Sequence, residues 1–165
     1  MRLAYLAQDR IELPFSSKEL ARNMQAPTKF DMEQLKRAVR FLIGAPRLVQ
    51  RFHMQSMPDK VTSYSDTDHA GCLKTRKSTS CTMIAFGKHL IRNTSTTQGV
   101  IALSSGESEF YGAVKSASVG LGIVSMLADM GVKMEKPLEL KLDATAGLGI
   151  ASRRGAGRQA HCDMS

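Results

Sequence analysis

The feature that most constrains the fold is one long helical pattern over residues 103–130. Its apolar residues recur every three or four positions, and Gly131 stands where the pattern stops. Such a helix must bury its apolar stripe against another layer, so the elements around it decide the fold class. The stripe that we expect to face the core consists of Phe110, Ala113, Val114, Ala117, Leu121, Val124 and Ala128.

Strand patterns lie on both sides of this helix. They cover residues 60–65, 80–86, 89–94 and 138–143. Gly87-Lys88 is a hairpin-like break between the second and third strands, and residues 144–152 read as a short final helix. This order predicts an α/β fold with an antiparallel three-stranded meander, a mixed sheet and flanking helices.

The first part of the chain reads as a helical hairpin. Residues 18–24 form one helix, with Ser16 and Glu19 at capping-box spacing and Pro27 as its stop. A second helix covers residues 32–43. Its cap is Thr28 or Asp31, Gly44 and Pro46 stop it, and its apolar stripe is Leu35, Val39, Leu42 and Ile43.

A boundary between two units is predicted near a turn at residues 57–59, after a short strand at 48–54. Residues 1–58 then form a mainly helical unit and residues 59–165 an α/β unit. A helix-turn-helix DNA reader centred on residues 16–44 is an alternative for the first unit. A packed helical hairpin explains the same pattern without base readout.

Composition indicates a basic intracellular protein. No apolar run approaches the ~20 residues that span a bilayer, and no secretory signal opens the chain, so we expect a cytoplasmic protein without a membrane partner. Virus-like particles and the nucleus are alternative locations. The cysteines, Cys72, Cys81 and Cys162, match neither a disulfide framework nor a zinc pattern. The net charge of +8 suits a polyanionic partner.

Acidic residues stand where two of the predicted strands end. Asp66 ends the first strand and Asp143 the fourth, and the carboxyl ends of neighbouring strands border the crevice of an open α/β sheet. Glu107 or Glu109, from the first turn of the long helix, can complete a cluster of three carboxylates. Such a cluster repels itself unless a hard cation such as Mg²⁺ or Mn²⁺ lies within it. A solvated strand-end or helix-cap residue explains each acid taken singly.

Several ordered motifs resemble the RNase H domain of copia-type retrotransposon Pol polyproteins. They are YSDTDHAG at residues 64–71, RKSTS at 76–80, ALSSGESEFY at 102–111, LDA at 142–144 and HCD at 161–163. The resemblance extends upstream, through residues 20–27 and 35–44, to the helical segment that ends reverse transcriptase. It covers nearly the whole chain and implies a C-terminal piece of reverse transcriptase followed by an RNase H-like domain.

This resemblance implies a metal-dependent endonuclease that hydrolyses the RNA strand of RNA–DNA hybrids during reverse transcription. Its catalytic and metal-binding residues would be Asp66, Glu109 and Asp143, holding two Mg²⁺ or Mn²⁺ ions. Glu109 is preferred over Glu107 because an aromatic residue follows it, and Asp68 is expected to be a neighbour that tunes the site. The hybrid is the implied substrate, and the remainder of the Pol polyprotein is the implied partner. The expected nucleic-acid contacts are Ser104 and Ser105, which also cap the helix, with Lys74, Arg76 and Lys77.

The chain also departs from the family pattern. His69 replaces the usual tryptophan, and Cys81 stands where the family favours glycine. Asp163 is expected to lie in a packing helix, because the family's fourth catalytic acid follows a fifth strand beyond Ser165. We therefore expect the isolated chain to be weak or inactive as a nuclease. The alternative function is a truncated or domesticated fragment that keeps the fold and only binds nucleic acid or a partner.

Overall fold

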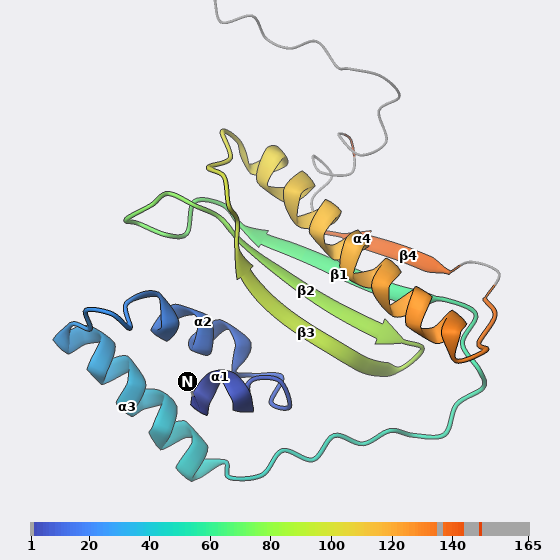
Figure 1. The fold of residues 1–165 in the computed structure, drawn as a ribbon, viewed down its shortest axis with the longest axis horizontal. Coiled ribbons are helices and arrows are strands. Elements are labelled where there is room, and N and C mark those ends of the chain that lie inside the picture. The colour runs from blue at the N-terminus through green and yellow to red at the C-terminus, as the bar shows by residue number, and fades with distance from the viewer. Residues whose placement is uncertain (1, 135–136, 144–148, 150–165) are drawn as a thin grey trace, which may run out of the picture.

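The computed structural model describes residues 2–134, 137–143 and 149. Within them the chain is an α/β structure with a four-stranded mixed sheet and flanking helices (Figure 1). The elements are α1 (Arg2–Leu6), α2 (Pro14–Arg22), α3 (Lys29–Gly44), β1 (Val61–Asp68), β2 (Thr79–Phe86), β3 (His89–Thr97), α4 (Ser105–Asp129) and β4 (Leu138–Leu142). The helix expected at 144–152 lies, apart from Gly149, outside the described residues, and so do Cys162 and Asp163.

The sheet has the strand order β3-β2-β1-β4. Strands β1, β2 and β3 are joined antiparallel, and β4 lies parallel to β1 on its other side. The predicted meander is therefore confirmed. Gly87 forms the β2–β3 turn at φ +60°, a conformation that glycine adopts without a steric cost. One boundary was wrong: β1 continues to Asp68, so Asp66 lies inside the strand rather than at its end.

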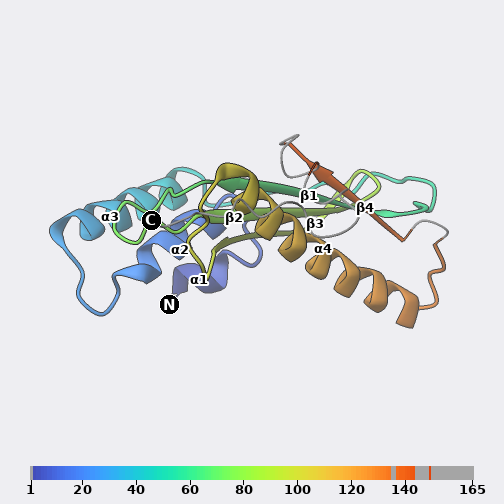
Figure 2. The ribbon, with the colours of Figure 1, turned by 90° about the horizontal axis from the view of Figure 1, so that it is seen from above.

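Helix α4 packs along the sheet against β1, β2 and β4 (Figures 1 and 2). Its buried side differs from the predicted stripe, since Val114 and Leu121 are 53% and 54% exposed. Small residues occupy the contact instead, because they let the helix backbone approach the strands closely. The buried α4 residues are Ser108, Glu109, Gly112, Ala113, Ser116, Gly120 and Ile123.

The interface between α4 and the sheet changes character along its length. At one end Val61, Ile84 and Ile123 form an apolar cluster, with partly buried side chains such as Leu138 packed on it. At the other end the buried face of β1 carries hydroxyls, because Ser65 and Thr67 alternate with exposed residues. The apolar end supplies hydrophobic stabilisation, and the polar end surrounds the first turns of α4.

The helical prediction for the first unit is confirmed in outline. Helix α3 begins with a reciprocal capping box, in which the Thr28 side chain accepts from the Asp31 backbone and Asp31 accepts from Thr28. The capping box predicted for α2 was wrong, because that helix starts at Pro14, a residue suited to a first helical position. Glu19 instead forms ion pairs with Lys18 and Arg22.

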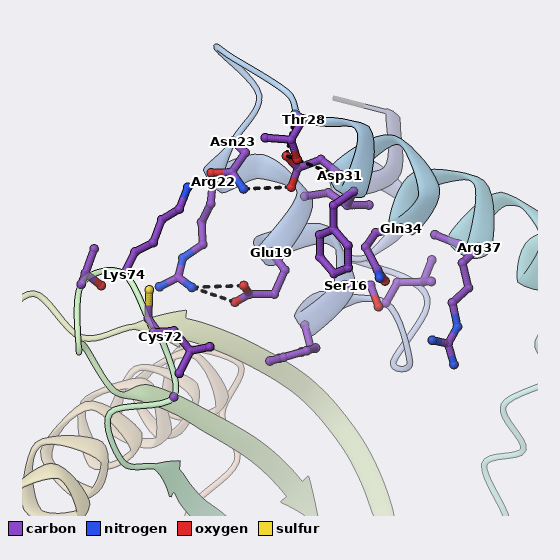
Figure 3. Close-up of a pocket in the computed structure, with 18 of the residues that line it drawn as sticks. Ser16, Glu19, Arg22, Asn23, Thr28, Asp31, Gln34, Arg37, Cys72 and Lys74 are labelled. Carbon is purple, nitrogen blue, oxygen red and sulfur yellow. Dashed lines mark hydrogen bonds and ion pairs between the residues drawn. The ribbon is translucent and has the colours of Figure 1, made fainter.

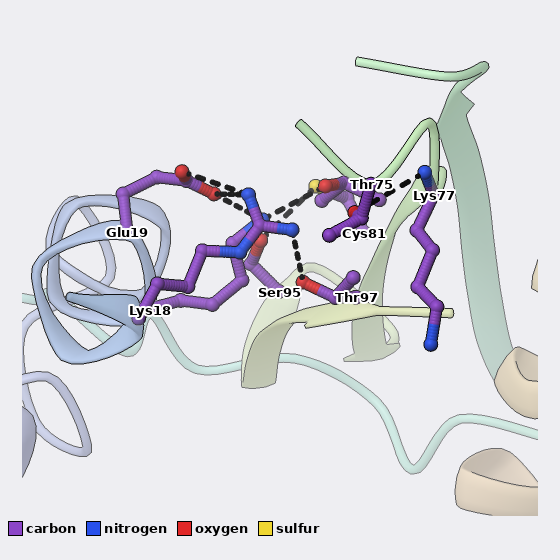
Figure 4. A network of polar contacts seen from close by, with 9 residues as sticks. Lys18, Glu19, Thr75, Lys77, Cys81, Ser95 and Thr97 are labelled. Atoms are coloured by element: carbon purple, nitrogen blue, oxygen red, sulfur yellow. Dashed lines mark hydrogen bonds and ion pairs between the residues drawn. The ribbon is translucent and has the colours of Figure 1, made fainter. Parts of the chain in front are cut away.

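Helix α2 is anchored on the sheet by side chains (Figure 4). Lys18 Nζ donates to Thr79 Oγ1 over 2.8 Å, and an Arg22 guanidinium nitrogen donates to Thr97 Oγ1 over 3.2 Å. Leu13, just before the helix, is almost fully buried. The three N-terminal helices lie on the β3 side of the sheet, at the edge opposite to β4 (Figures 1 and 2).

The strand predicted at residues 48–54 was wrong, since the structure assigns no strand between α3 and β1. Side chains hold this segment: Gln50 donates to the Leu90 carbonyl and Gln55 to the Phe86 carbonyl. The segment therefore lies along the β2–β3 hairpin without a backbone ladder. The boundary at residue 58 stays a prediction.

Among the described helices, α4 alone has the length and apolar composition of a membrane-spanning segment. The expectation that no stretch of the chain approaches that length was therefore wrong. Its contacts with three strands are those of a helix packed within a domain.

Candidate active site

The predicted pairing of the two acidic strands is confirmed. The parallel register of β1 and β4 runs to Ser65 beside Leu142, and the next residues along the two strands are Asp66 and Asp143. Neighbouring strands lie about 4.8 Å apart, so the register continued by one residue brings these two backbones together. Both side chains are exposed. They lie at the carboxyl end of the parallel pair, where ligands bind in open α/β sheets.

Glu109 reaches this region from α4 and is only 7% exposed. Its Oε2 atom is buried without a hydrogen-bond partner. Burial raises the pKa of the Glu109 carboxyl above its ordinary value, and the charges of Asp66 and Asp143 raise it further. The structure therefore couples the three predicted carboxylates electrostatically.

The carboxylate of Glu107, the alternative to Glu109, forms hydrogen bonds at the start of α4. One of its oxygens accepts from the Leu103 backbone N–H over 2.7 Å, and the other accepts from the Tyr111 hydroxyl over 2.9 Å. These hydrogen bonds lower the pKa of Glu107. Its own backbone N–H is capped by Ser104 Oγ. The capping of α4 thus accounts for both carboxylate oxygens of Glu107, whereas Glu109 is the acid with an oxygen that has no local partner.

Sequence reasoning missed a group of buried polar atoms around Glu109. Ser65 Oγ, Thr67 Oγ1 and Gln98 Oε1 are buried without hydrogen-bond partners, like Glu109 Oε2. Gln98 donates to Ser80 Oγ and to the Ser108 carbonyl, which ties β2 to α4. The alternation of Ser63, Ser65 and Thr67 with exposed residues was the available signal, because hydroxyls on a buried strand face need polar neighbours.

The three carboxylates approach from different sides. By the alternation of β1, Asp66 lies on the face opposite to Ser65 and Thr67, which face α4 and its Glu109. Within the described part of the chain, no three His, Cys, Asp or Glu side chains lie close enough to hold one metal ion. Since Asp66 and Asp143 are exposed, their side chains can rotate without disturbing the core. The donors are all carboxylate oxygens, the ligand type that Mg²⁺ and Mn²⁺ prefer.

The predicted nucleic-acid contacts lie on the surface beside α4. Ser104 is the N-cap of α4, as predicted, whereas Ser105 is the first helical residue and does not cap. Lys74 and Arg76 are exposed in the loop after β1, and Lys77 is half-buried. His69, in the same loop, is close enough to Glu107 to interact with it electrostatically, so the loop runs near the start of α4.

Cys81, one of the departures from the family pattern, and Asp68 both lie close to Asp66. Cys81 is its cross-strand partner on β2. Asp68 folds over the backbone of Gly71, where a Cβ atom would collide with its carboxylate. This contact is consistent with the neighbouring, non-ligand role predicted for Asp68.

Comparison with known proteins finds relatives among transposon polyproteins. The chain is 30% identical over 135 residues, 82% of its length, to the Retrovirus-related Pol polyprotein from transposon RE1 of Arabidopsis thaliana, and equally to that from transposon RE2. It is 28% identical over 116 residues to the Uncharacterized mitochondrial protein AtMg00810 of the same plant, covering 70% of this chain and 48% of that protein. No family profile and no solved structure matches the chain.

The chain spans 9% of the length of the two Pol polyproteins. The relationship predicted from the motifs at residues 64–71, 76–80 and 102–111 is thereby confirmed. This chain is homologous, over most of its length, to a segment of retrotransposon Pol polyproteins.

Proposed function

We propose that this chain carries the RNase H part of a retrotransposon Pol polyprotein and that its α/β unit has an RNase H-like fold. The activity would be metal-dependent hydrolysis of the RNA strand of RNA–DNA hybrids. The observation that carries the proposal is Glu109, a buried carboxylate whose pKa is raised by Asp66 and Asp143 at the end of the parallel β1–β4 pair. A buried carboxyl of perturbed pKa near acidic residues at the carboxyl ends of neighbouring strands is typical of catalytic sites.

The donor set fits hard divalent cations. Burying Glu109 Oε2 without a hydrogen bond costs free energy, and a cation would supply the missing partner. We propose that Asp66, Glu109 and Asp143 together hold Mg²⁺ or Mn²⁺, two ions in the active domain. When bound, such ions activate water and stabilise the charge on a departing oxygen.

The residues of the chain then have distinct roles. Glu109, fixed within the helix–sheet interface, would supply a rigid ligand, and the exposed Asp66 and Asp143 would supply ligands from the paired strands β1 and β4. Lys74 and Arg76, exposed in the loop after β1, would contact phosphates, and the Ser104 hydroxyl caps α4. Recognition of the RNA strand rests on its 2′-hydroxyl groups, which DNA lacks.

The test is cleavage of a labelled RNA–DNA hybrid by the 165-residue chain in Mg²⁺ and in Mn²⁺. We expect a longer Pol segment that contains the chain to cut the RNA strand alone and the isolated chain to cut weakly or not at all, with any cutting lost in Asp66→Asn and absent on duplex DNA. A contaminating nuclease would cut equally with the Asp66→Asn protein. Since the chain is a small part of its relatives, the same assay is repeated with a longer Pol segment.

A second candidate function is favoured by one observation. The described carboxylates do not form a ready metal cage, which is expected if the chain is an inactive fragment that only binds nucleic acid. In that case the hybrid would bind with equal affinity to the wild type and to Asp66→Asn, with no cutting by either chain or by the longer segment.

A further inference from the structure

A large cavity lies between helices α2 and α3 and the loop at residues 71–75, away from the three carboxylates. Its volume is about 1110 Å³. Figure 3 shows Cys72 and Lys74 of the loop on one side of this space and Thr28, Asp31 and Gln34 on the other. We call it the α2–α3 cavity. Its size is at the upper end of the range of ligand sites, about 300–1,000 Å³.

Aromatic rings stand in the walls of the α2–α3 cavity. Phe30 and Phe41 are 69% and 47% exposed, and Phe15 lies on the facing helix with Lys18 Nζ 4.8 Å above its ring. Exposing phenylalanine rings to water is unfavourable, and covering them with a ligand would be favoured by the hydrophobic effect. Their clustering on one concave surface therefore indicates a ligand with flat or apolar groups.

The acids that line the cavity already have partners. Glu12 pairs with Arg10, Glu19 pairs with Lys18 and Arg22, and Asp31 accepts hydrogen bonds from Thr28 and Asn23. Two cations remain.

Among the described residues, the side chains of Arg37 and Lys74 have neither an ion pair nor a hydrogen-bond partner, and both line the cavity. Lys74 acts electrostatically on Asp31 across the cavity, so Arg37 is the lining cation without a counter-charge, and the net charge of the chain, +8, also favours an anionic ligand.

Rings and unpaired cations together specify the class of ligand. Unpaired nucleobases stack on aromatic side chains while their phosphates pair with arginine and lysine. A duplex does not fit this chemistry, because each base face is already covered by the next base pair. An apolar peptide would use the rings and leave Arg37 without a counter-charge.

We propose that the α2–α3 cavity binds single-stranded nucleic acid, with bases stacked on Phe30 and Phe41 and phosphates on Arg37 and Lys74. The site shares Lys74 with the proposed hybrid contacts but uses none of Asp66, Glu109 and Asp143, and the variants tested below leave Lys74 unchanged. Its failure would therefore leave the proposed nuclease standing, and failure of the nuclease would leave this site standing.

The experiment measures fluorescence anisotropy of a labelled single-stranded oligo(dT) on the 165-residue chain in EDTA, over a range of salt concentrations. Phe30→Leu and Phe41→Leu keep the apolar surface and remove the ring, so each should weaken binding by about fivefold or more. Arg37→Gln should lower the slope of log affinity against log salt by about 0.7. Circular dichroism and thermal melting check that these surface variants fold.

Arg40→Gln is the matched control. Arg40 is exposed on the same helix, beside Met32, Leu35 and Val39 rather than in the α2–α3 cavity, and its loss changes the net charge by the same amount. Its affinity should stay near that of the wild type, and Asp66→Asn should also bind normally.

Four results would overturn the proposal. The first is no binding of oligo(dT) by the wild type at low salt. The second is equal loss in Arg37→Gln and Arg40→Gln, which means diffuse surface attraction. The third is unchanged affinity in both leucine variants. Displacement of the strand by an amphipathic peptide whose own affinity is insensitive to Arg37→Gln would also overturn it and would identify a protein-docking site.

Discussion

Ser63 on β1 and Ser116 on α4 place their hydroxyl oxygens 2.7 Å apart, inside an interface from which both side chains are fully excluded from solvent. Ser63 also donates to the Ser116 carbonyl. This contact joins the helix to the sheet by hydrogen bonds. Most helix–sheet interfaces are instead packed with aliphatic side chains. It lies between the apolar cluster around Ile123 and the polar end that holds Glu109. The pair therefore fixes the position of α4 on β1 between these two ends.

The Ser63–Ser116 pair should be measurable as a coupling free energy. We expect Ser63→Ala and Ser116→Ala each to lower the free energy of unfolding by about 1 kcal/mol, because each leaves a buried hydroxyl with fewer partners. The double variant should lose less than the sum, with a coupling of about 0.5 kcal/mol or more. Urea denaturation of the four proteins checks this, and strict additivity would contradict the contact.

Two glycines of α4 should respond oppositely to the same substitution. In Gly112→Ala the new Cβ atom would collide with Thr67 Oγ1 and crowd Ser65 Oγ, so we expect a loss of about 1–3 kcal/mol. In Gly122→Ala the Cβ atom meets nothing within 4 Å, and we expect a gain of up to about 1 kcal/mol from helix propensity.

Urea denaturation of both glycine variants beside the wild type gives the two free energies. A stabilised Gly112→Ala would mean that α4 lies further from β1 than the structure has it. Loss of stability in Gly122→Ala would mean that another segment covers that side of the helix.

The elements of the α/β unit could be predicted from sequence because each has a local signal. The β2–β3 hairpin follows from Gly87, and the end of α4 from Gly131 at φ +83°. The buried side of α4 was missed because hydrophobicity alone selects Val114 and Leu121, whereas the contact is built from small residues. Residues 48–54 look like a strand but lack a partner strand, and only tertiary structure decides that.

The candidate site was partly predictable for a similar reason. Local motifs identified Asp66, Glu109 and Asp143, and the β1–β4 pairing that brings them together follows from the α/β order. The spacing of the two glutamates could not separate Glu107 from Glu109, since helical phase leaves both near the sheet. Gln98 was not predicted, because a single glutamine in a loop has no pattern.

The start of α3 should make stability depend on pH in acid. Hydrogen bonds from the Thr28 side chain, then from Asn23 and the Thr28 backbone, lower the pKa of Asp31 from 3.8 to about 2. A lowered carboxyl pKa contributes stability that is present above pH 3.8 and is lost as the pH falls through about 2. The difference in melting temperature between wild type and Asp31→Asn should therefore shrink between about pH 5 and pH 2.

Glu33→Gln is the control for Asp31. Glu33 lies on the same helix in an exposed ion pair with Lys36, a type of contact that contributes little at any pH. A difference for Asp31→Asn that stays constant from about pH 5 to pH 2 would contradict the capping box.

Substitutions of Glu107 and of Glu109 should have opposite effects on stability and different effects on activity. The pKa of Glu109 is raised, so its ionisation lowers stability as the pH rises above 4.5, and Glu109→Gln should melt higher than wild type at neutral pH without metal. The pKa of Glu107 is lowered by helix-cap hydrogen bonds, so Glu107→Gln should melt lower at the same pH.

For cleavage of an RNA–DNA hybrid the order reverses: Glu109→Gln should lose metal-dependent cutting, and Glu107→Gln should keep it. Differential scanning fluorimetry with and without Mn²⁺ adds a readout independent of cleavage, since the ion should stabilise wild type and Glu107→Gln but not Glu109→Gln. Cutting and Mn²⁺ stabilisation that survive in Glu109→Gln and vanish in Glu107→Gln would move the metal ligand to Glu107, two residues earlier on α4.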